Sequence, residues 1–239
     1  PHGAAGASAL ASEFPPPVTT FSGSIRSRLG DALGIDWSAL KRGEYRQTGP
    51  QLPDVDLEKP MGTADDTGLL EFDAPVLRKA AQRLYPVPAI LMQSDSGLVR
   101  MSLGTPVKTD LGNVQLPELP GGVLSAKPLD NCWLTAEGLQ RFLDGGIPES
   151  DQIISQSRIF SYESRLGIGR DARLGTVKSG LLYQTEHLRL EPDADIAIRV
   201  TLPKAAADLL LESIGQNPLQ RFGGEGRMAV LSAAQVEPP

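Results

Sequence analysis

Cysteine and histidine are almost absent from this chain of 239 residues, and their scarcity excludes several kinds of site. Cys132 is the only cysteine, so neither an internal disulfide nor a zinc site built from several cysteines can form. The only histidines are His2 and His187, and their spacing does not suggest a pair of metal ligands. The chain also lacks a Cys/His/Asp arrangement for nucleophilic catalysis, so we predict no catalytic residue, metal or cofactor.

Long apolar runs are missing as well. No run approaches the roughly 18 apolar residues that cross a bilayer, and no signal peptide is visible, so we expect no membrane partner. A chain without disulfides is compatible with a reducing cytoplasm, and we expect it there. Hydrophobic residues at 40% and charged residues at 22% are typical of a soluble globular protein.

The formal net charge of −6, taken alone, argues against a nucleic-acid binder, but the charge is unevenly distributed. Residues 158–189 contain six Lys or Arg and three Asp or Glu, whereas residues 54–71 contain six acids and one Lys. The later part of the chain can therefore contact phosphates locally, despite the acidic total.

Three segments carry helical signals. Prolines force an extended entry into a helix predicted over about 23–33, whose apolar residues recur every four positions. Thr135 as a cap and Gly145 as a stop signal predict a second helix over about 135–143. An amphipathic third helix is expected to begin near residue 203 and to end near Gly215.

The remaining segments predict strands and loops. Two apolar, β-rich runs around a polar, glycine-containing tip indicate a long hairpin over about 158–190, and alternation predicts a core strand over 196–202. Residues 41–68 read as a long loop, and a glycine-rich loop at 222–227 leads into a final strand. The expected fold class is α+β with mainly antiparallel sheets.

The sharpest motif is FGGEGR at 222–227. Its glycines let the backbone approach a phosphate closely and present bare N–H groups, while Arg221 and Arg227 supply positive charge. The spacing matches neither the dinucleotide-binding nor the P-loop pattern. Taken alone, the motif is more typical of a tight turn that needs positive φ, so only its context favours binding.

Four segments, taken in order, resemble the RAMP subunit of type III-B CRISPR (Cmr) complexes that caps the 5′ handle of the guide RNA. They are FPPPVTTFSGSIRSRLG, LYPVPAILM together with KPLDNCWLTAEGLQRFLDG, SRLGIGRDARLGTVKSGLLYQTEHLRL, and FGGEGR. The first residues, PHG, resemble the stretch just after the family's first strand. We therefore expect that strand to be missing here, and the chain ends earlier than the family usually does.

The resemblance implies two ferredoxin-like halves, 1–130 and 131–239, and a projecting thumb hairpin at about 158–190. It implies a non-catalytic subunit that holds the handle of the guide RNA (crRNA) beside the large polymerase/nuclease-like subunit and the backbone RAMP subunits. The implied RNA-binding residues are Gly23, Ser24, Arg26 and Arg28 in the first helix, Arg170, Arg173 and Lys178 in the thumb, and Gly223, Gly224, Gly226 and Arg227 in the glycine loop.

Two other functions stay open at this point. A guide-processing endoribonuclease of the same superfamily would need a positioned acid or base, and His2 lies where the missing first strand would end. A purely structural assembly subunit would use the basic hairpin to contact another protein. The aromatic content of 5% argues against base stacking on a sheet face in any of these roles.

Overall fold

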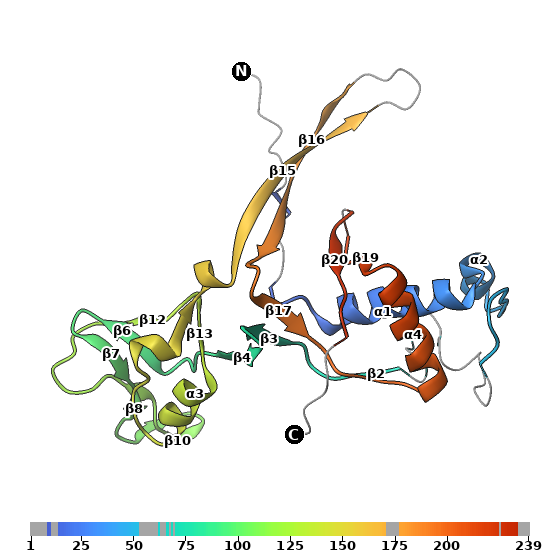
Figure 1. The fold of residues 1–239 in the computed structure, drawn as a ribbon. Helices are drawn as coiled ribbons and strands as arrows, with labels where there is room; N and C mark the ends of the chain where they lie inside the picture. Colours follow the sequence, from blue (N-terminus) through green and yellow to red (C-terminus); the bar gives the residue numbers. More distant parts are fainter. Residues whose placement is uncertain are drawn as a thin grey trace. The chain divides into compact units, whose positions relative to one another are not determined.

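The chain divides into two compact units (Figure 1). Unit 1 joins residues 1–76, 162–187 and 196–239, and unit 2 joins residues 77–161 and 188–195. The computed structural model describes residues 9–10, 14–52, 62, 66, 68, 70–170, 177–224 and 226–233. A division into halves at residue 130 stays a prediction.

Helices and a long hairpin make up unit 1. Its helices are α1 (Val18–Leu33), α2 (Trp37–Lys41) and α4 (Lys204–Gln216). Its short strands are β1 (Ala9–Leu10), β2 (Glu71–Phe72), β18 (Val200–Thr201), β19 (Leu219–Arg221) and β20 (Met228–Val230). Most of the long strands β15 (Phe160–Arg170) and β16 (Val177–Leu190) also belong to it.

Helix α1 begins at Val18, so the predicted start near residue 23 was wrong. Pro17 stands at the N-cap, where a missing N–H breaks no helical hydrogen bond, so proline starts the helix without penalty. Phe21 extends the four-residue spacing of Ile25, Leu29 and Leu33 by one turn, so the pattern already reached further back than the predicted start. Phe21 is only 6% exposed, so its packing anchors the first turns of the helix.

The C-terminal end of α1 requires a glycine. Gly34 adopts φ +66°, its N–H donates to the Asp31 carbonyl, and the Ile35 N–H donates to the Gly30 carbonyl at 2.9 Å. This is the left-handed helix ending that glycine favours. A Cβ at Gly34 would also lie 2.6 Å from Thr48 Oγ1, so both backbone and space exclude a side chain there.

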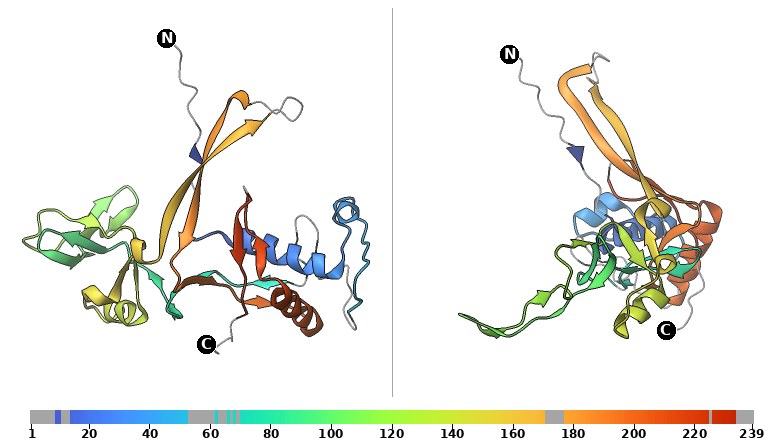
Figure 2. Two further views of the ribbon diagram at one scale, coloured as in Figure 1. Left: turned by 45° about the horizontal axis from the view of Figure 1, so that its top comes forward. Right: turned by 90° about the vertical axis from the view of Figure 1, so that its left-hand side faces the viewer.

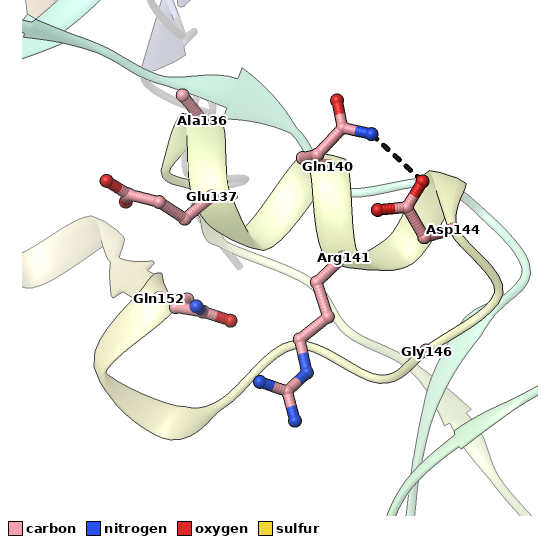
Figure 3. Close-up of a pocket in the computed structure, with 7 residues that line it drawn as sticks. All are labelled: Ala136, Glu137, Gln140, Arg141, Asp144, Gly146 and Gln152. Atoms are coloured by element: carbon pink, nitrogen blue, oxygen red, sulfur yellow. Dashed lines mark hydrogen bonds between the residues drawn. The ribbon is translucent and has the colours of Figure 1, made fainter.

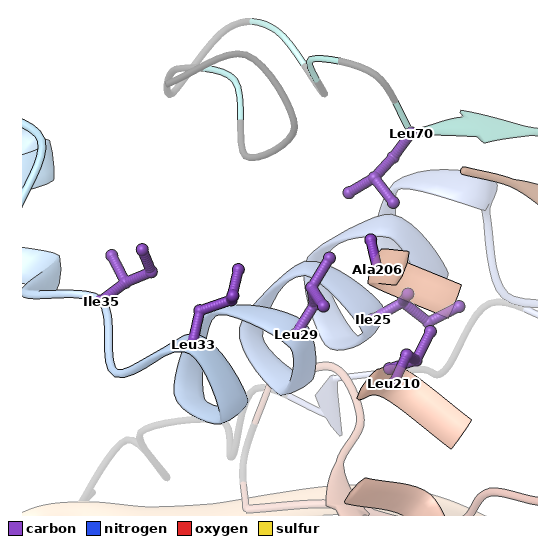
Figure 4. Packing of buried hydrophobic residues seen from close by; sticks show 7 residues of the cluster. All are labelled: Ile25, Leu29, Leu33, Ile35, Leu70, Ala206 and Leu210. Atoms are coloured by element: carbon purple, nitrogen blue, oxygen red, sulfur yellow. The ribbon is translucent and has the colours of Figure 1, made fainter. Parts of the chain in front are cut away.

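The core of unit 1 lies between α1 and α4 (Figure 4). Leu29 and Leu33 of α1 are fully buried, as is Ala206 of α4, while Leu70 and Leu210 are almost fully buried. The four-residue spacing predicted this stripe on α1, and the structure confirms it. Both views of Figure 2 keep the two helices side by side.

The predicted core strand over 196–202 is interrupted. Strand β17 (Ala194–Ala197) ends before β18 begins, and β18 pairs with β2 through Val200↔Phe72. Ile198, Val200 and Leu202 nevertheless pack against the core, as their alternation predicted. In the predicted loop 41–68, the described residues 42–52 form no strand beyond an isolated bridge from Ile35 to Gln47, and residues 53–61 lie outside the described ranges.

The predicted long hairpin is confirmed. Strands β15 and β16 are neighbours in one sheet, and β1 pairs in parallel with the other edge of β16 through Ala9↔Gln184. Thr185 is 5% exposed, and its hydroxyl donates to the Arg165 carbonyl at 3.4 Å. The predicted tip includes residues 171–176, which lie outside the described residues.

Small sheets dominate unit 2. Its strands are β3 (Val76–Lys79), β4 (Gln82–Arg83), β5 (Tyr85–Pro86), β6 (Leu91–Ser94), β7 (Gly97–Arg100), β8 (Ser102–Leu103), β9 (Val107–Thr109), β10 (Gly112–Val114), β11 (Pro117–Glu118), β12 (Lys127–Pro128), β13 (Cys132–Leu134) and β14 (Ile153–Ser155). The helices are α3 (Ala136–Leu143) and the 3-10 turns η1 (Ser150–Gln152) and η2 (Gln156–Arg158). Across both units, the ladders with a described register are antiparallel except for β1–β16, so the α+β, mainly antiparallel class is confirmed.

Local signals and buried residues both hold unit 2 together. The Thr135 hydroxyl accepts from the Gly138 N–H at 3.2 Å, which confirms Thr135 as the cap of α3. Leu91, Leu134 and Ile159 are fully buried. Arg78 makes a two-pronged pair with Asp195, with N–O distances of 2.7 and 2.9 Å, the strongest geometry for a guanidinium and a carboxylate.

Candidate nucleic-acid interface

The glycine motif forms the turn of a short hairpin. Strands β19 and β20 pair through Gln220↔Ala229, and the Phe222 N–H donates to the Arg227 carbonyl at 2.9 Å. The Arg227 N–H in turn donates to the Gly224 carbonyl at 3.2 Å. The described residues of the turn expose Gly223, Gly224 and Gly226 (Glu225 lies outside the description), so the turn presents backbone, as a phosphate-binding loop requires.

Helix α1 lies against one side of this turn. The rings of Phe21 and Phe222 meet edge to face, with centroids 4.9 Å apart. The buried Ser24 hydroxyl donates to the Arg221 carbonyl at 2.9 Å. A Cβ at Gly223 would lie 3.6 Å from Thr20 Cγ2, so the turn sits beside the first turns of α1.

The long hairpin meets the same turn. The half-buried Arg227 donates from Nη2 to the Glu186 carbonyl of β16 at 3.2 Å. Elements distant in sequence therefore converge in unit 1: the start of α1, the glycine turn, and the β16 backbone. Of the predicted residues, Ser24 contacts the strand that leads into the turn, and Arg227 joins the turn to β16. Whether these residues bind RNA stays a prediction.

The glycines of this site differ in whether the backbone conformation requires a glycine. Gly223 (φ +77°) and Gly226 (φ +67°) are left-handed, so the turn itself explains them. Gly224 lies outside the left-handed region, and a Cβ there would meet nothing within 4 Å. Gly23, in the middle of α1, also has open space around it. A helix interior disfavours glycine, so nothing within the described fold accounts for Gly23 or Gly224.

The two predicted arginines of α1 have different surroundings. Burial lowers the pKa of the Arg26 guanidinium, and the nearby Asp66 carboxylate offsets part of that effect. Arg26 still carries its positive charge at neutral pH. Arg28 turns instead toward the end of α4, where Nη2 donates to the Ser213 and Asn217 carbonyls and Nη1 donates to the Leu219 carbonyl at 3.4 Å.

The side chains of the predicted thumb residues lie outside what the structure describes. Arg170 ends β15 and Lys178 lies near the start of β16, with side chains outside the description, and Arg173 lies outside the described residues. Nearer the base, Arg165 pairs with Glu163 of the same strand at 2.9 Å. The structure therefore leaves the three tip residues as predictions.

Sequence reasoning missed the residues that hold the turn in place. Phe21 and Thr20 were read as lying before the helix, and the contact of Phe222 with Phe21 joins residues that no local pattern links. Two signals were present in the sequence: Phe21 stands four residues before Ile25 on the apolar stripe, and Phe222 precedes the glycines of the motif.

Unit 2 offers a weaker candidate. An open pocket lies along α3 and is lined by Ala136, Glu137, Gln140, Arg141, Asp144, Gly146 and Gln152 (Figure 3). Its charges are largely matched internally, because Gln140 donates to Asp144 and Arg141 pairs with the neighbouring Glu149. Among the described residues, no group of three or more His, Cys, Asp or Glu side chains is arranged to hold a metal ion.

Taken together, the described residues form an α+β chain that gathers a glycine turn, a helix and a long hairpin in one unit. The turn exposes glycine backbone beside Arg221 and Arg227. The chain belongs to the Cas_Cmr3 family of CRISPR-associated proteins, whose family model matches residues 1–238. The predicted resemblance to a Cmr RAMP-type subunit is thereby confirmed.

Solved structures with a similar chain include the cryo-EM structures of the type III-B Cmr-beta complex bound to cognate target RNA, alone and with AMPPnP (state 1). Both matches have 18% sequence identity and a TM-score of 0.48, and both cover 95% of this chain. The chain spans 55% and 56% of the length of those chains, little more than half. No curated protein matches the chain. Within the described ranges, no helix is long and apolar enough to cross a membrane.

Proposed function

We propose that this chain is the non-catalytic RNA-binding subunit of a type III-B CRISPR effector complex and holds the 5′ handle of the guide RNA. In this proposal its two halves are ferredoxin-like, and the β15–β16 hairpin is a thumb that separates handle from guide. Its protein partners are the large polymerase/nuclease-like subunit and the backbone RAMP subunits, and the complex works in the cytoplasm.

The observation that carries the proposal is the presence of glycine where the fold does not require it. Gly23 and Gly224 have no neighbour within 4 Å of a Cβ position, and neither adopts a left-handed conformation. Gly121 and Gly215 are equally open, so openness alone does not mark a binding site. What sets Gly23 and Gly224 apart is their position beside the arginines of the turn, where an external partner that approaches the backbone closely would need glycine. The two lie on adjoining elements, α1 and the turn that packs on it, so one partner can contact both.

The chemistry of this surface suits a single-stranded RNA backbone. The exposed glycine backbone of the turn, the positive end of α1 and the arginines at 221 and 227 all favour phosphate. The first turn of α1 contains no acidic side chain that would oppose it. Because binding depends on local charge, the overall charge of −6 is no obstacle.

The proposed contacts are graded by their surroundings. We propose Gly23, Arg26, Gly223, Gly224, Gly226 and Arg227 as the central contacts, with Arg170, Arg173 and Lys178 as further contacts in the thumb. Ser24 and Arg28, which the resemblance also implies as contacts, use their donors on backbone carbonyls of unit 1, and Ser24 is buried.

A matched pair of glycine variants tests the proposal. Gly224→Val places an isopropyl group on the turn, and Gly121→Val makes the same change in unit 2, where a Cβ also meets nothing within 4 Å. We expect Gly224→Val to weaken binding of a guide RNA transcribed from the host's own CRISPR repeat by about tenfold, the effect of a steric conflict of 1–2 kcal/mol. We expect Gly121→Val to bind as the wild type does.

Two outcomes count against the proposal. Equal RNA affinity of Gly224→Val and wild type at physiological salt would remove the turn from the binding site. Specific, metal-independent cleavage of repeat RNA by the purified chain would favour the endoribonuclease reading instead. When the native complex is purified, we expect RNA to co-purify with it as a mixture of guides that all share one 5′ end.

A further inference from the structure

Arg28 occupies the corner where α4 ends and β19 begins. Its Nη2 donates to the carbonyls of Ser213 and Asn217, and its Nη1 donates to the carbonyl of Leu219 at 3.4 Å. The side chain of Asn217 closes the same corner by accepting from the Leu219 N–H at 3.0 Å. One guanidinium thus binds carbonyls on both sides of the bend that leads into the glycine turn.

Arg28 supplies the positive charge that the C-terminal end of α4 lacks. The last carbonyls of a helix have no partners within the helix and carry partial negative charge, and cations near them are stabilising. The last turn of α4 contains no basic residue, so Arg28 brings that charge from the neighbouring helix. A guanidinium suits the task because its fork of donors can reach several carbonyls at once.

The same face of α1 holds the turn at two further points. Ser24 donates to the Arg221 carbonyl, and Phe21 packs on Phe222. Residues 21, 24 and 28 lie on one side of a helix, because they are three and four positions apart. They contact the segment 213–222 in reverse order, so α1 holds the bend, β19 and the start of the turn along its length (Figures 1 and 2).

We propose that Ser24 and Arg28 are positioning residues that fix the glycine turn and do not themselves contact RNA. The inference rests on the proposed function for the effect on RNA, but its structural part stands alone. The donors that a phosphate would need are directed at backbone carbonyls of the same unit, and Ser24 is only 6% exposed. If Ser24 or Arg28 is replaced, RNA affinity should fall because the glycine turn is no longer held in place.

Trypsin cleavage of the full chain tests the structural part without RNA. Arg221 and Arg227 flank the turn and are cleavage sites, so a loosened turn is cut faster. We expect Arg28→Lys, which keeps the charge but not the fork of donors, and Ser24→Ala to raise cleavage at these sites by about threefold or more. Arg42→Lys is the control, because Arg42 is a 57% exposed arginine of the same unit outside this corner. Cleavage at the wild-type rate in both Arg28→Lys and Ser24→Ala overturns the proposal.

A double-mutant cycle with the same guide RNA tests how the effect reaches RNA. We expect Arg28→Lys alone to weaken binding about fivefold, and to add almost nothing in a Gly224→Val background, because both changes act through one turn. If the double variant loses affinity by the full product of the two single-variant factors, Arg28 contacts the RNA independently, and the proposal is overturned. If wild-type chain binds no guide RNA, the proposed function fails while the trypsin result still decides the positioning role.

Discussion

Replacing Gly23 by alanine is expected to stabilise unit 1 and, at the same time, to weaken guide-RNA binding. Gly23 lies inside α1, is exposed, and has no atom within 4 Å of its Cβ position apart from the backbone of its own helix and its chain neighbours. A helix-interior glycine is about 0.5–1 kcal/mol less favourable than alanine, because glycine loses more backbone entropy on folding. With no steric conflict to subtract, the free energy of unfolding should rise by about that amount.

The expected effect on RNA has the opposite sign. If the RNA backbone lies against α1 at this position, an added methyl group must displace it, at a cost of about 1 kcal/mol or more. Affinity would then fall about fivefold or more. A change that strengthens the fold and weakens binding cannot be explained by damage to the structure.

Two measurements separate these effects. Urea unfolding can be followed by Trp37 fluorescence in a Trp133→Phe background, since these are the only tryptophans and Trp37 belongs to unit 1. Fluorescence anisotropy with labelled guide RNA gives the affinity. Gly215→Ala is the matched control, because Gly215 is an exposed glycine of α4 with equally open surroundings.

The reasoning would be refuted by either of two results. A lower free energy of unfolding for Gly23→Ala would mean that the space around Gly23 is occupied within the chain. Unchanged RNA affinity, alongside the expected gain in stability, would mean that the RNA does not approach this face of α1. We expect Gly215→Ala to gain no more stability than Gly23→Ala and to bind RNA normally.

Three further predictions concern the fold itself. Leu29→Ala should lower the free energy of unfolding of unit 1 by about 3 kcal/mol, because Leu29 is fully buried between helices, and a loss below about 1 kcal/mol by urea titration would contradict the packing. Burial raises the pKa of the Cys132 thiol, with a smaller contribution from a nearby carboxylate, so less of the reactive thiolate is present at pH 8. Alkylation by iodoacetamide at pH 8 should therefore be slower in the native chain than in urea, and equal rates would contradict this. The hydrogen bond from Lys79 lowers the pKa of Asp193. The stabilisation from the charged Asp193 is therefore full above its unfolded pKa of about 4 and is lost as the pH falls through its folded pKa. Asp193→Asn should remove this part of the acid dependence of the urea midpoint, and an unchanged dependence would contradict the prediction.

Local patterns predicted the elements whose signals lie within a few residues. Thr135 and Gly145 predicted where α3 begins and ends, and the apolar runs predicted the β15–β16 hairpin. The spacing of Leu29 and Leu33 predicted the buried stripe of α1. Caps, periodicity and turn chemistry act over short separations, so the amino-acid order alone determines them. The ordered set of motifs likewise predicted the family.

The tertiary structure decided where those elements meet and what their residues do there. Arg28 binds carbonyls that lie 185 to 191 positions away along the chain, and Ser24 binds one that is 197 positions away. No local signal distinguishes an arginine that binds phosphate from one that closes the end of another helix. The same holds for glycine: the fold requires Gly34 through its left-handed φ and the closeness of Thr48, whereas nothing lies within 4 Å of a Cβ at Gly224. Long-range packing decides both questions, because burial and hydrogen-bond partners come from whichever segments the fold brings together.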